Sequence, residues 1–81
     1  MKLYLLSQNT NSGYDTYDSC VVCAENEEDA KTILPDGGIF GDNQYQGWWW
    51  VEDINLVRCV EIGTANEDQE RGVIIESFNA G

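Results

Sequence analysis

The chain has 81 residues, which is long enough for one domain and too short for a second hydrophobic core. Its 42% of hydrophobic residues and 11% of aromatic residues are typical of a folded protein. Fifteen aspartate and glutamate residues stand against four lysine and arginine residues, giving a net charge of −11 that argues against direct binding of nucleic acid or of an anionic membrane.

The N-terminal apolar segment, residues 1–6, runs directly into polar residues and is shorter than a secretory signal. No stretch of the sequence approaches the roughly 20 apolar residues that cross a membrane. We therefore expect no membrane partner and a cytoplasmic location. The three cysteines, an odd number set in apolar runs, are typical of buried side chains in a reducing compartment.

Two strands are expected in the first third of the chain. Residues 3–8 are mostly apolar and end at a polar turn, and residues 19–24 are apolar with two β-branched side chains. We expect them to pair as a hairpin across a polar connection. Cys20 and Cys23 lie three positions apart on the second strand, so they project to opposite faces and do not converge on a metal ion.

A short helix is the clearest local signal in the sequence. Asn26 is a good N-cap, the acidic residues after it suit the positive end of the helix dipole, and Asp29 occupies the capping-box position. We expect a helix at residues 27–34, ended by a proline and packed on the sheet, because two to three turns are not stable alone in water. Its apolar stripe consists of Ala30, Ile33 and Leu34.

The second half of the chain predicts a loop and two further strands. Residues 36–47 contain four glycines and little periodicity. Residues 54–62 alternate in polarity and residues 73–78 are largely apolar, so each is expected to be a strand. The order along the chain is β-β-α-β-β, which predicts a single α+β domain over residues 1–81: a four-stranded antiparallel sheet with one helix on one face.

One helix would leave the second face of the sheet partly bare. The apolar residues expected to need cover there are Val21, Cys23, Val57, Cys59 and Ile74. The long loop, the tryptophans or another subunit could supply that cover. A homodimer is therefore a reasonable inference.

No group of residues supports catalysis. Histidine is absent, which removes the commonest general base and the usual activator of a serine or cysteine nucleophile. The glycine patterns of phosphate-binding and dinucleotide-binding loops do not occur, and the glycine-rich segment lacks the ligand spacing of an EF-hand. The sequence therefore predicts a chain that binds rather than catalyses, with no catalytic residue, no metal site and no cofactor.

Two segments are candidates for binding a partner. Residues 13–19 have the tyrosine, serine, glycine and aspartate composition of adaptable binding loops, although a solvated hairpin has the same composition. On a strand, Trp48 and Trp50 would share one face and Trp49 the other, so at least one ring should be exposed at an interface or should cover the open sheet face. The candidates are Tyr14, Asp15, Tyr17, Asp18, Trp48, Trp49 and Trp50.

The acidic side chains gather in two clusters, at residues 25–29 and 67–70. Arrays of carboxylates can imitate the phosphates of a duplex, and small acidic inhibitors of DNA-binding enzymes use that device. The alternative is a helix N-terminus and a solvated turn. The second cluster adds Glu67, Asp68 and Glu70 to the candidates for contact with a basic surface.

Several blocks of the sequence are distinctive: residues 1–8 (MKLYLLSQ), 11–19 (NSGYDTYDS), 21–30, 71–75 and 77–81. Together they cover about half of the chain, and they resemble a set of small uncharacterised proteins of bacteriophages and prophages. The resemblance implies a phage context and no established activity. Small acidic phage proteins are often accessory factors that bind and block a host enzyme, including anti-defence and anti-CRISPR proteins.

We therefore expect an accessory protein of the phage type that acts in the host cytoplasm, where it binds and inhibits a host protein with a basic surface. One alternative is an oligomeric small-ligand binder that sequesters a signalling nucleotide. Its phosphate could be met only by Lys2, Lys31, Arg58 and Arg71. Another alternative is a structural or assembly factor of the phage particle.

Overall fold

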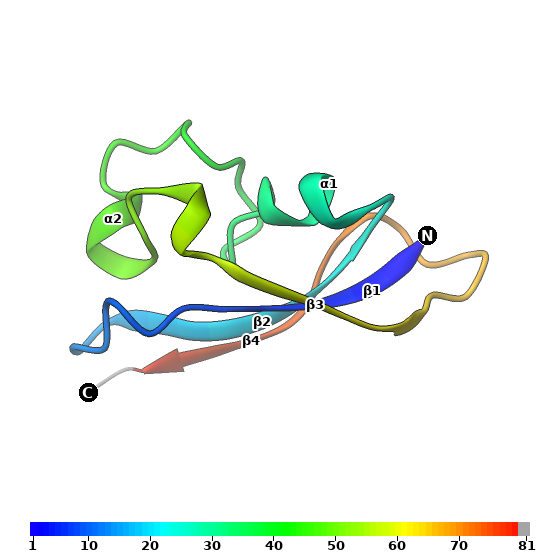
Figure 1. The fold of residues 1–81 in the computed structure, drawn as a ribbon, viewed down its shortest axis with the longest axis horizontal. Helices are drawn as coiled ribbons and strands as arrows, with labels where there is room; N and C mark the ends of the chain where they lie inside the picture. Colours follow the sequence, from blue (N-terminus) through cyan, green and yellow to red (C-terminus); the bar gives the residue numbers. More distant parts are fainter. Residues whose placement is uncertain (80–81) are drawn as a thin grey trace.

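The computed structural model describes residues 1–79 and contains one four-stranded antiparallel sheet. Its strands are β1 (Lys2–Ser7), β2 (Thr16–Ala24), β3 (Arg58–Thr64) and β4 (Gly72–Asn79). They lie in the order β3-β1-β2-β4, so the predicted α+β class and the antiparallel sheet are confirmed (Figure 1). β1 and β2 form the expected hairpin, while β3 pairs with β1 and β4 pairs with β2.

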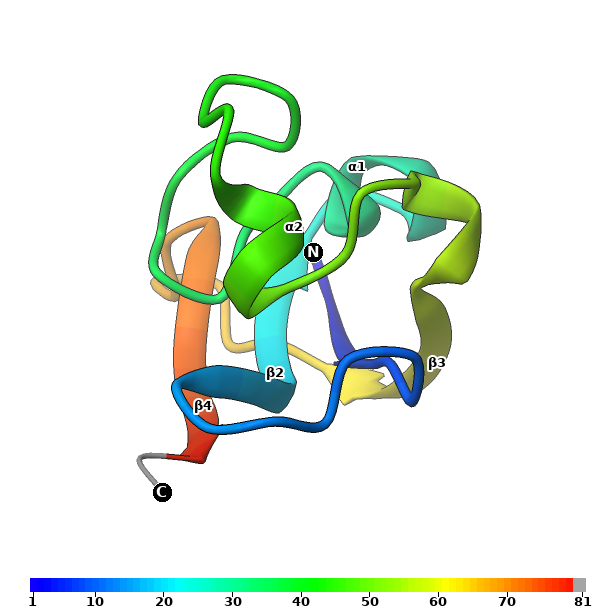
Figure 2. The same ribbon diagram turned by 90° about the vertical axis from the view of Figure 1, so that its left-hand side faces the viewer.

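The helical elements cover one face of this sheet. They are α1 (Glu27–Lys31), α2 (Gln46–Trp49) and a 3-10 turn, η1 (Ile54–Leu56). All of them lie on the same side of the strands (Figures 1 and 2). The sequence predicted only the first, so the number of helical elements in the chain segment before β3 was underestimated. None of the helices in residues 1–79 has the length and the apolar character needed to cross a membrane.

Two predicted element boundaries were wrong. α1 ends at Lys31 instead of residue 34, and Thr32 caps it while donating its hydroxyl to the Asp29 carbonyl oxygen at 2.6 Å. The predicted apolar stripe of Ala30, Ile33 and Leu34 is buried as expected. Ile33 and Leu34 follow the helix, and Ile33 forms an isolated β-bridge with Ile39. Residues 54–62 begin with the 3-10 turn η1 instead of a strand, because the Asp53 side chain caps that turn by accepting from the backbone amide of Asn55.

The core lies between the sheet and the helical layer. Leu6, Val22 and Trp50 are fully buried there, together with Leu34 from the segment after α1. The remaining buried hydrophobic members of this core are Tyr4, Cys20, Ala24, Ala30, Ile33, Val51 and Val57. The indole Nε1 of Trp50 has no hydrogen-bond partner within residues 1–79, so burial of Trp50 leaves one polar atom unsatisfied.

The opposite face of the sheet, here called the open face, has no covering layer in the described chain. Strand register places Leu5 beside Val21 and Val60, and Val21 beside Ile75. Ile75 is 62% exposed and Val60 is 40% exposed. Antiparallel sheets often leave one face to solvent, but that face is usually polar. This one carries a row of aliphatic side chains.

The sequence misassigned part of this face. Val57 and Cys59 were expected among the residues in need of cover, but Val57 is buried in the core and Cys59 packs against it. The 3-10 turn before β3 places them there. Cys23 does project to the open face, where it is covered by Met1 and by the turn before β4: its Sγ lies 4.0 Å from Met1 Sδ and 4.0 Å from the Gln69 carbonyl oxygen.

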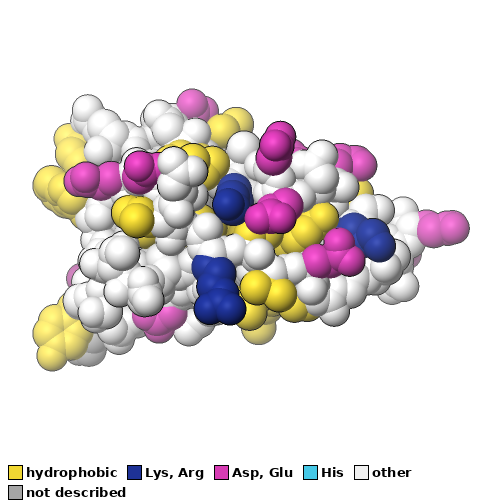
Figure 3. Space-filling model, in the orientation of Figure 1, with side chains coloured by type: hydrophobic (Ala, Val, Ile, Leu, Met, Phe, Trp, Pro, Cys, Tyr) yellow, Lys and Arg dark blue, Asp and Glu magenta, His cyan; other side chains and the backbone are white. Residues whose placement is uncertain are grey.

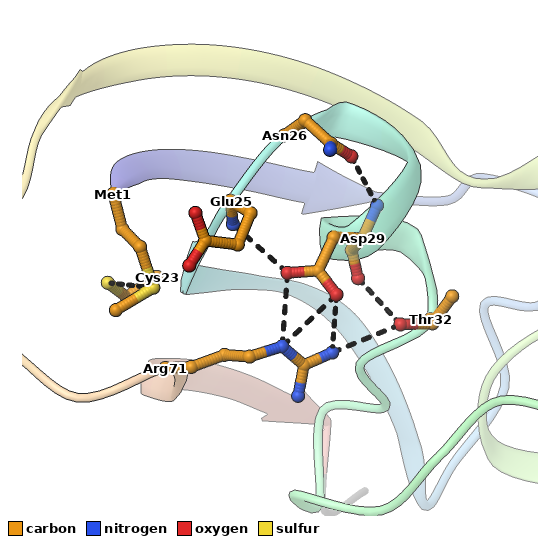
Figure 4. Close-up of polar contacts among 7 residues, drawn as sticks. All are labelled: Met1, Cys23, Glu25, Asn26, Asp29, Thr32 and Arg71. Carbon is orange, nitrogen blue, oxygen red and sulfur yellow. Dashed lines mark hydrogen bonds and ion pairs between the residues drawn. The ribbon is translucent and has the colours of Figure 1, made fainter.

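An ion pair ties the N-terminus of α1 to the start of β4 (Figure 4). Both oxygens of Asp29 accept from Arg71, with Nη2 to Oδ1 at 2.8 Å and Nε to Oδ2 at 3.0 Å. Asn26 caps the helix by accepting from the Asp29 amide, and the Asp29 carboxylate accepts from the Glu25 amide. The hydrogen bond to Arg71, followed by that from Glu25, lowers the pKa of Asp29.

Candidate functional site

The three consecutive tryptophans occupy three different environments at one end of the molecule. Trp48 is 74% exposed, Trp49 is partly buried, and Trp50 is fully buried in the core. The prediction that Trp48 and Trp50 share a face was wrong because this segment is helical, and residues two apart on a helix point in nearly opposite directions. α2, which carries Trp48 and Trp49, lies on the same side of the sheet as α1 (Figure 1), and Trp50 is buried in the core, so the tryptophans do not cover the open face.

Two amide side chains hold the tryptophan segment in place. Asn11, from the connection between β1 and β2, donates through Nδ2 to the carbonyl oxygens of Gly47, Trp48 and Trp50 at 3.1, 3.0 and 3.1 Å. The buried Gln46 accepts from the Gly41 amide at 2.7 Å and donates to the Val51 carbonyl oxygen at 3.2 Å. These bonds satisfy carbonyls that a four-residue helix leaves free at its C-terminus.

Exposed aromatic rings surround this anchored helix. Tyr45 and Trp48, three residues apart, pack with ring centroids 5.2 Å apart and are 51% and 74% exposed. Tyr14, in the neighbouring β1–β2 connection, is 76% exposed. Figure 3 shows hydrophobic side chains at this end of the molecule with acidic side chains beside them. We call this surface the aromatic end; it consists of Tyr14, Tyr17, Tyr45, Trp48, Trp49 and Phe78.

Within the aromatic end, three rings form an open box. Tyr17 packs against Trp49 with centroids 5.8 Å apart and planes at 70°, and against Phe78 at 4.8 Å and 59°. The ring planes of Trp49 and Phe78 are therefore both steeply inclined to the plane of Tyr17. A cavity of ≈ 330 Å³ lies here, lined by Asp15, Tyr17, Asp36, Trp49 and Phe78. Burial, and then the charges of Asp36 and Glu76, raise the pKa of Tyr17, so its hydroxyl is neutral at physiological pH.

The predicted partner-binding residues lie in three different places in the structure: at the aromatic end, in the core, and at the opposite end of the molecule. Tyr14, Asp15, Tyr17, Trp48 and Trp49 come together at the aromatic end, and Asp18 is exposed in a bulge of β2 nearby. Trp50 is buried and cannot contact a partner. The acidic turn with Glu67, Asp68 and Glu70 lies at the opposite end of the molecule, beside the N-terminus (Figure 1). A backbone hydrogen bond from Ala65 to the Met1 carbonyl oxygen, 3.1 Å, fixes it there.

Three residues of this surface were missed by the sequence analysis. Phe78 joins the three-ring group because β4 pairs with β2, and this pairing places Phe78 opposite Tyr17. The order of the elements along the chain does not specify this long-range pairing. Asp36 arrives on the turn after Pro35. Tyr45 could have been found, since its i, i+3 spacing from Trp48 is a helical signal.

Most of the basic side chains are already engaged elsewhere. Within residues 1–79 the ion pairs are Lys2 with Glu61 at 3.8 Å, Lys31 with Glu27 at 3.8 Å, and Arg71 with Asp29 at 2.8 Å. Arg58 is exposed on β3 and has no ion pair in that part of the chain. No lysine or arginine lines the cavity at the aromatic end.

The cysteines lack the environment of reactive thiols. Burial, with a smaller contribution from the charge of Glu76, raises the pKa of Cys20 to about 12. Burial also raises the pKa of Cys59. Both thiols are therefore protonated at neutral pH and poor nucleophiles. Cys20 faces the core while Cys23 faces the other side, and no group of three or more potential metal ligands occurs within residues 1–79.

Comparison of the chain with protein-family models, with curated proteins and with solved structures finds no match.

Proposed function

We propose that this chain is a binding protein that docks its aromatic end on a basic surface of a protein partner and inhibits that partner by occupying it. The observation that carries the proposal is the exposure of Trp48 and Tyr14, at 74% and 76%, on an anchored helix and its neighbouring loop. Tryptophan and tyrosine are the residues most enriched at binding hot spots. The net charge of −11 favours a basic partner.

The resemblance to small phage and prophage proteins supplies the biological setting of the proposal. In that setting the partner is a host protein in the host cytoplasm, such as a nucleic-acid-handling or defence enzyme, CRISPR effectors included. In this proposal inhibition is stoichiometric, because each bound chain blocks one partner molecule by occupying its surface.

The nucleotide-sequestering alternative has less support. A bound phosphate needs cationic partners, and three of the four basic side chains are held in ion pairs by carboxylates of this same chain. The cavity in the aromatic end is flanked by two further carboxylates, which repel phosphate. No specific observation favours a role in particle assembly.

We also propose that two copies pair through their open faces. The positions that strand register places on that face carry aliphatic, small or hydroxyl side chains, with Arg58 at one edge, and none carries a carboxylate. In a chain with fifteen acids this is the face on which two copies meet with least repulsion. Packing of two sheets face to face would bury the aliphatic row that includes Val60 and Ile75.

The binding proposal is tested by capture from a bacterial host lysate with matched variants. Immobilised wild type is compared with Trp48→Ala/Tyr14→Ala and with Glu67→Gln/Asp68→Asn/Glu70→Gln, which removes charge at the opposite end. We expect a basic host protein that is lost with the aromatic variant, retained with the acidic-turn variant, and inhibited by the purified wild-type chain. If no captured protein depends on the aromatic residues, the proposal is wrong.

A further inference from the structure

The aromatic box has the geometry of a receptor for one side chain. Two ring planes stand at 70° and 59° to the Tyr17 ring, so three π systems border one cavity of ≈ 330 Å³. The faces of aromatic rings carry partial negative charge and attract ammonium and guanidinium groups within about 6 Å of the ring centroid. Phe78 is 46% exposed, which leaves one wall of the box open to an incoming group.

Hydrogen bonds hold the backbone at Asp15, one of the two aspartates that line the cavity. Asp15 is in the left-handed region, with φ 59°, and its amide donates to the Asn79 carbonyl oxygen. The Gly13 carbonyl oxygen accepts from Thr16 Oγ1 at 2.7 Å and from Asn79 Nδ2 at 3.1 Å, so the loop is tied to the end of β4. An aspartate tolerates this conformation, but it is uncommon outside glycine and therefore requires such support.

Asp36, the second aspartate that lines the cavity, is fixed by its own turn. Its Oδ1 accepts from the Gly38 amide at 2.9 Å, and the turn is closed by bonds between Leu34 and Gly37 and between Gly38 and Leu34. One oxygen of Asp36 is thus used locally and the other is left for a ligand. Neither Asp15 nor Asp36 forms an ion pair within residues 1–79. The negative charge of the cavity is therefore uncompensated.

We infer that this cavity is a receptor for a cationic side chain, an arginine or a lysine, projecting from the basic partner. The aromatic rings would hold the cation and its aliphatic stem, and Asp15 and Asp36 would pair with its charge. Burial is the main cause of the raised pKa of Tyr17, and the smaller contributions from the charges of Asp36 and Glu76 agree with a negative potential at this place. The identity of the occupant as a partner side chain rests on the function proposed above.

The test uses the isolated chain and small probes, so it needs no knowledge of the partner. The ¹⁵N-labelled protein is titrated with Nα-acetyl-arginine amide and Nα-acetyl-lysine amide, with the citrulline analogue as an uncharged control of the same shape. We expect saturable shifts of the Trp49 indole N–H and of the Asp15 and Tyr17 amides with the cationic probes. The citrulline analogue should leave these signals unchanged.

Two variants locate the effect. Asp15→Asn/Asp36→Asn keeps the acceptor that Gly38 needs and should weaken binding of the arginine probe by about tenfold, the loss of one well-placed pair of charges. The matched control Asp42→Asn/Asp53→Asn makes the same change in net charge at exposed positions away from the cavity, and should bind like the wild type. Phe78→Leu removes one wall and should weaken binding while leaving the remaining amide signals in place.

Three outcomes of these titrations would overturn the inference. Equal shifts with citrulline would show that charge is not recognised, and wild-type affinity in Asp15→Asn/Asp36→Asn would show that the carboxylates take no part. Tighter binding of choline than of the arginine probe would reassign the site to small quaternary amines. The functional proposal can fail separately: it is wrong if a partner is captured independently of Trp48 and Tyr14, whatever the probes do.

Discussion

Asn11 donates through Nδ2 to the carbonyl oxygen of Trp50 at 3.1 Å, although 39 residues separate them in the chain. The same amide serves the carbonyls of Gly47 and Trp48. One side chain therefore closes the C-terminus of α2 and joins it to the β1–β2 connection, two of the segments that form the aromatic end. Together with the hydrogen bonds of Gln46, this contact holds the segment that carries the exposed Trp48.

Asn11→Ala should lower the free energy of unfolding by about 1–2 kcal/mol, because several carbonyls lose their donor while solvent can still reach part of them. The loss should be accompanied by greater mobility of Trp48 and Trp49, seen as faster amide exchange at residues 46–50. Urea unfolding and hydrogen exchange measure the two effects. Asn55→Ala, whose side chain makes no hydrogen bond in residues 1–79, is the control; an equal loss there would refute the special role of Asn11.

Ile33→Asp should cost several kcal/mol by placing a charge in the core, enough to unfold a domain of this size. Ile33 is only 3% exposed, whereas its bridge partner Ile39 is 59% exposed. Ile39→Asp is therefore a matched control that should melt close to the wild type. Thermal unfolding followed by circular dichroism distinguishes them, and equal melting temperatures would contradict the core assignment.

Arg71→Gln should destabilise the fold at neutral pH by about 0.5–1 kcal/mol, because the pair with Asp29 is bidentate but partly exposed. The folded-state pKa of Asp29 lies below its ordinary value of 3.8. Its stabilising contribution is thus complete above that value and is lost as the pH falls through the lowered pKa. The difference in unfolding free energy between wild type and variant should shrink toward zero in that acid range. A difference that persists once the Asp29 carboxyl is protonated would mean that Arg71 acts through packing instead.

The sheet was predictable because its signals are local, whereas the site is the product of long-range contacts. Residues 3–8 and 19–24 show their strand character in short apolar runs, and Asn26 with Asp29 specifies the start of α1 within four residues. The local signal for a helix at residues 46–49 is weak, limited to the i, i+3 spacing of Tyr45 and Trp48, and the donor for the free carbonyls of this helix is the distant Asn11. Phe78 and Asp36 meet Tyr17 only through strand pairing and a turn, which periodicity does not reveal.

The charge distribution changes one expectation about association. The acidic turn with Glu67, Asp68 and Glu70 lies at the far end of a molecule 36 Å long, beyond the screening length of about 8 Å at physiological salt. It should therefore contribute little to the association rate of a partner that docks at the aromatic end, although the sequence made these three acids candidates for contact with a basic surface. Asp15 and Asp36, at the contact itself, should contribute more.

Ile75→Asp should prevent pairing of two copies through the open face, because it would place like charges opposite each other in an apolar contact. Ile75 is 62% exposed, so the monomer should remain folded. Analytical ultracentrifugation should give twice the 9.1 kDa chain mass for the wild type and for the control Ile39→Asp, and the chain mass for Ile75→Asp. A wild type that sediments as a monomer at high concentration would refute the dimer.

The most direct test of the binding account is surface plasmon resonance on the captured partner, comparing wild type with Trp48→Ala and with Glu67→Gln/Asp68→Asn/Glu70→Gln. Trp48→Ala should accelerate dissociation by about tenfold or more, as expected for a hot-spot ring, without lowering the melting temperature. The acidic-turn variant should keep both rate constants within about twofold of the wild type, because the charges that it lacks lie farther from the contact than the screening length. Unchanged dissociation of Trp48→Ala together with loss of binding by the acidic-turn variant would contradict the account and place the contact at the other end of the molecule.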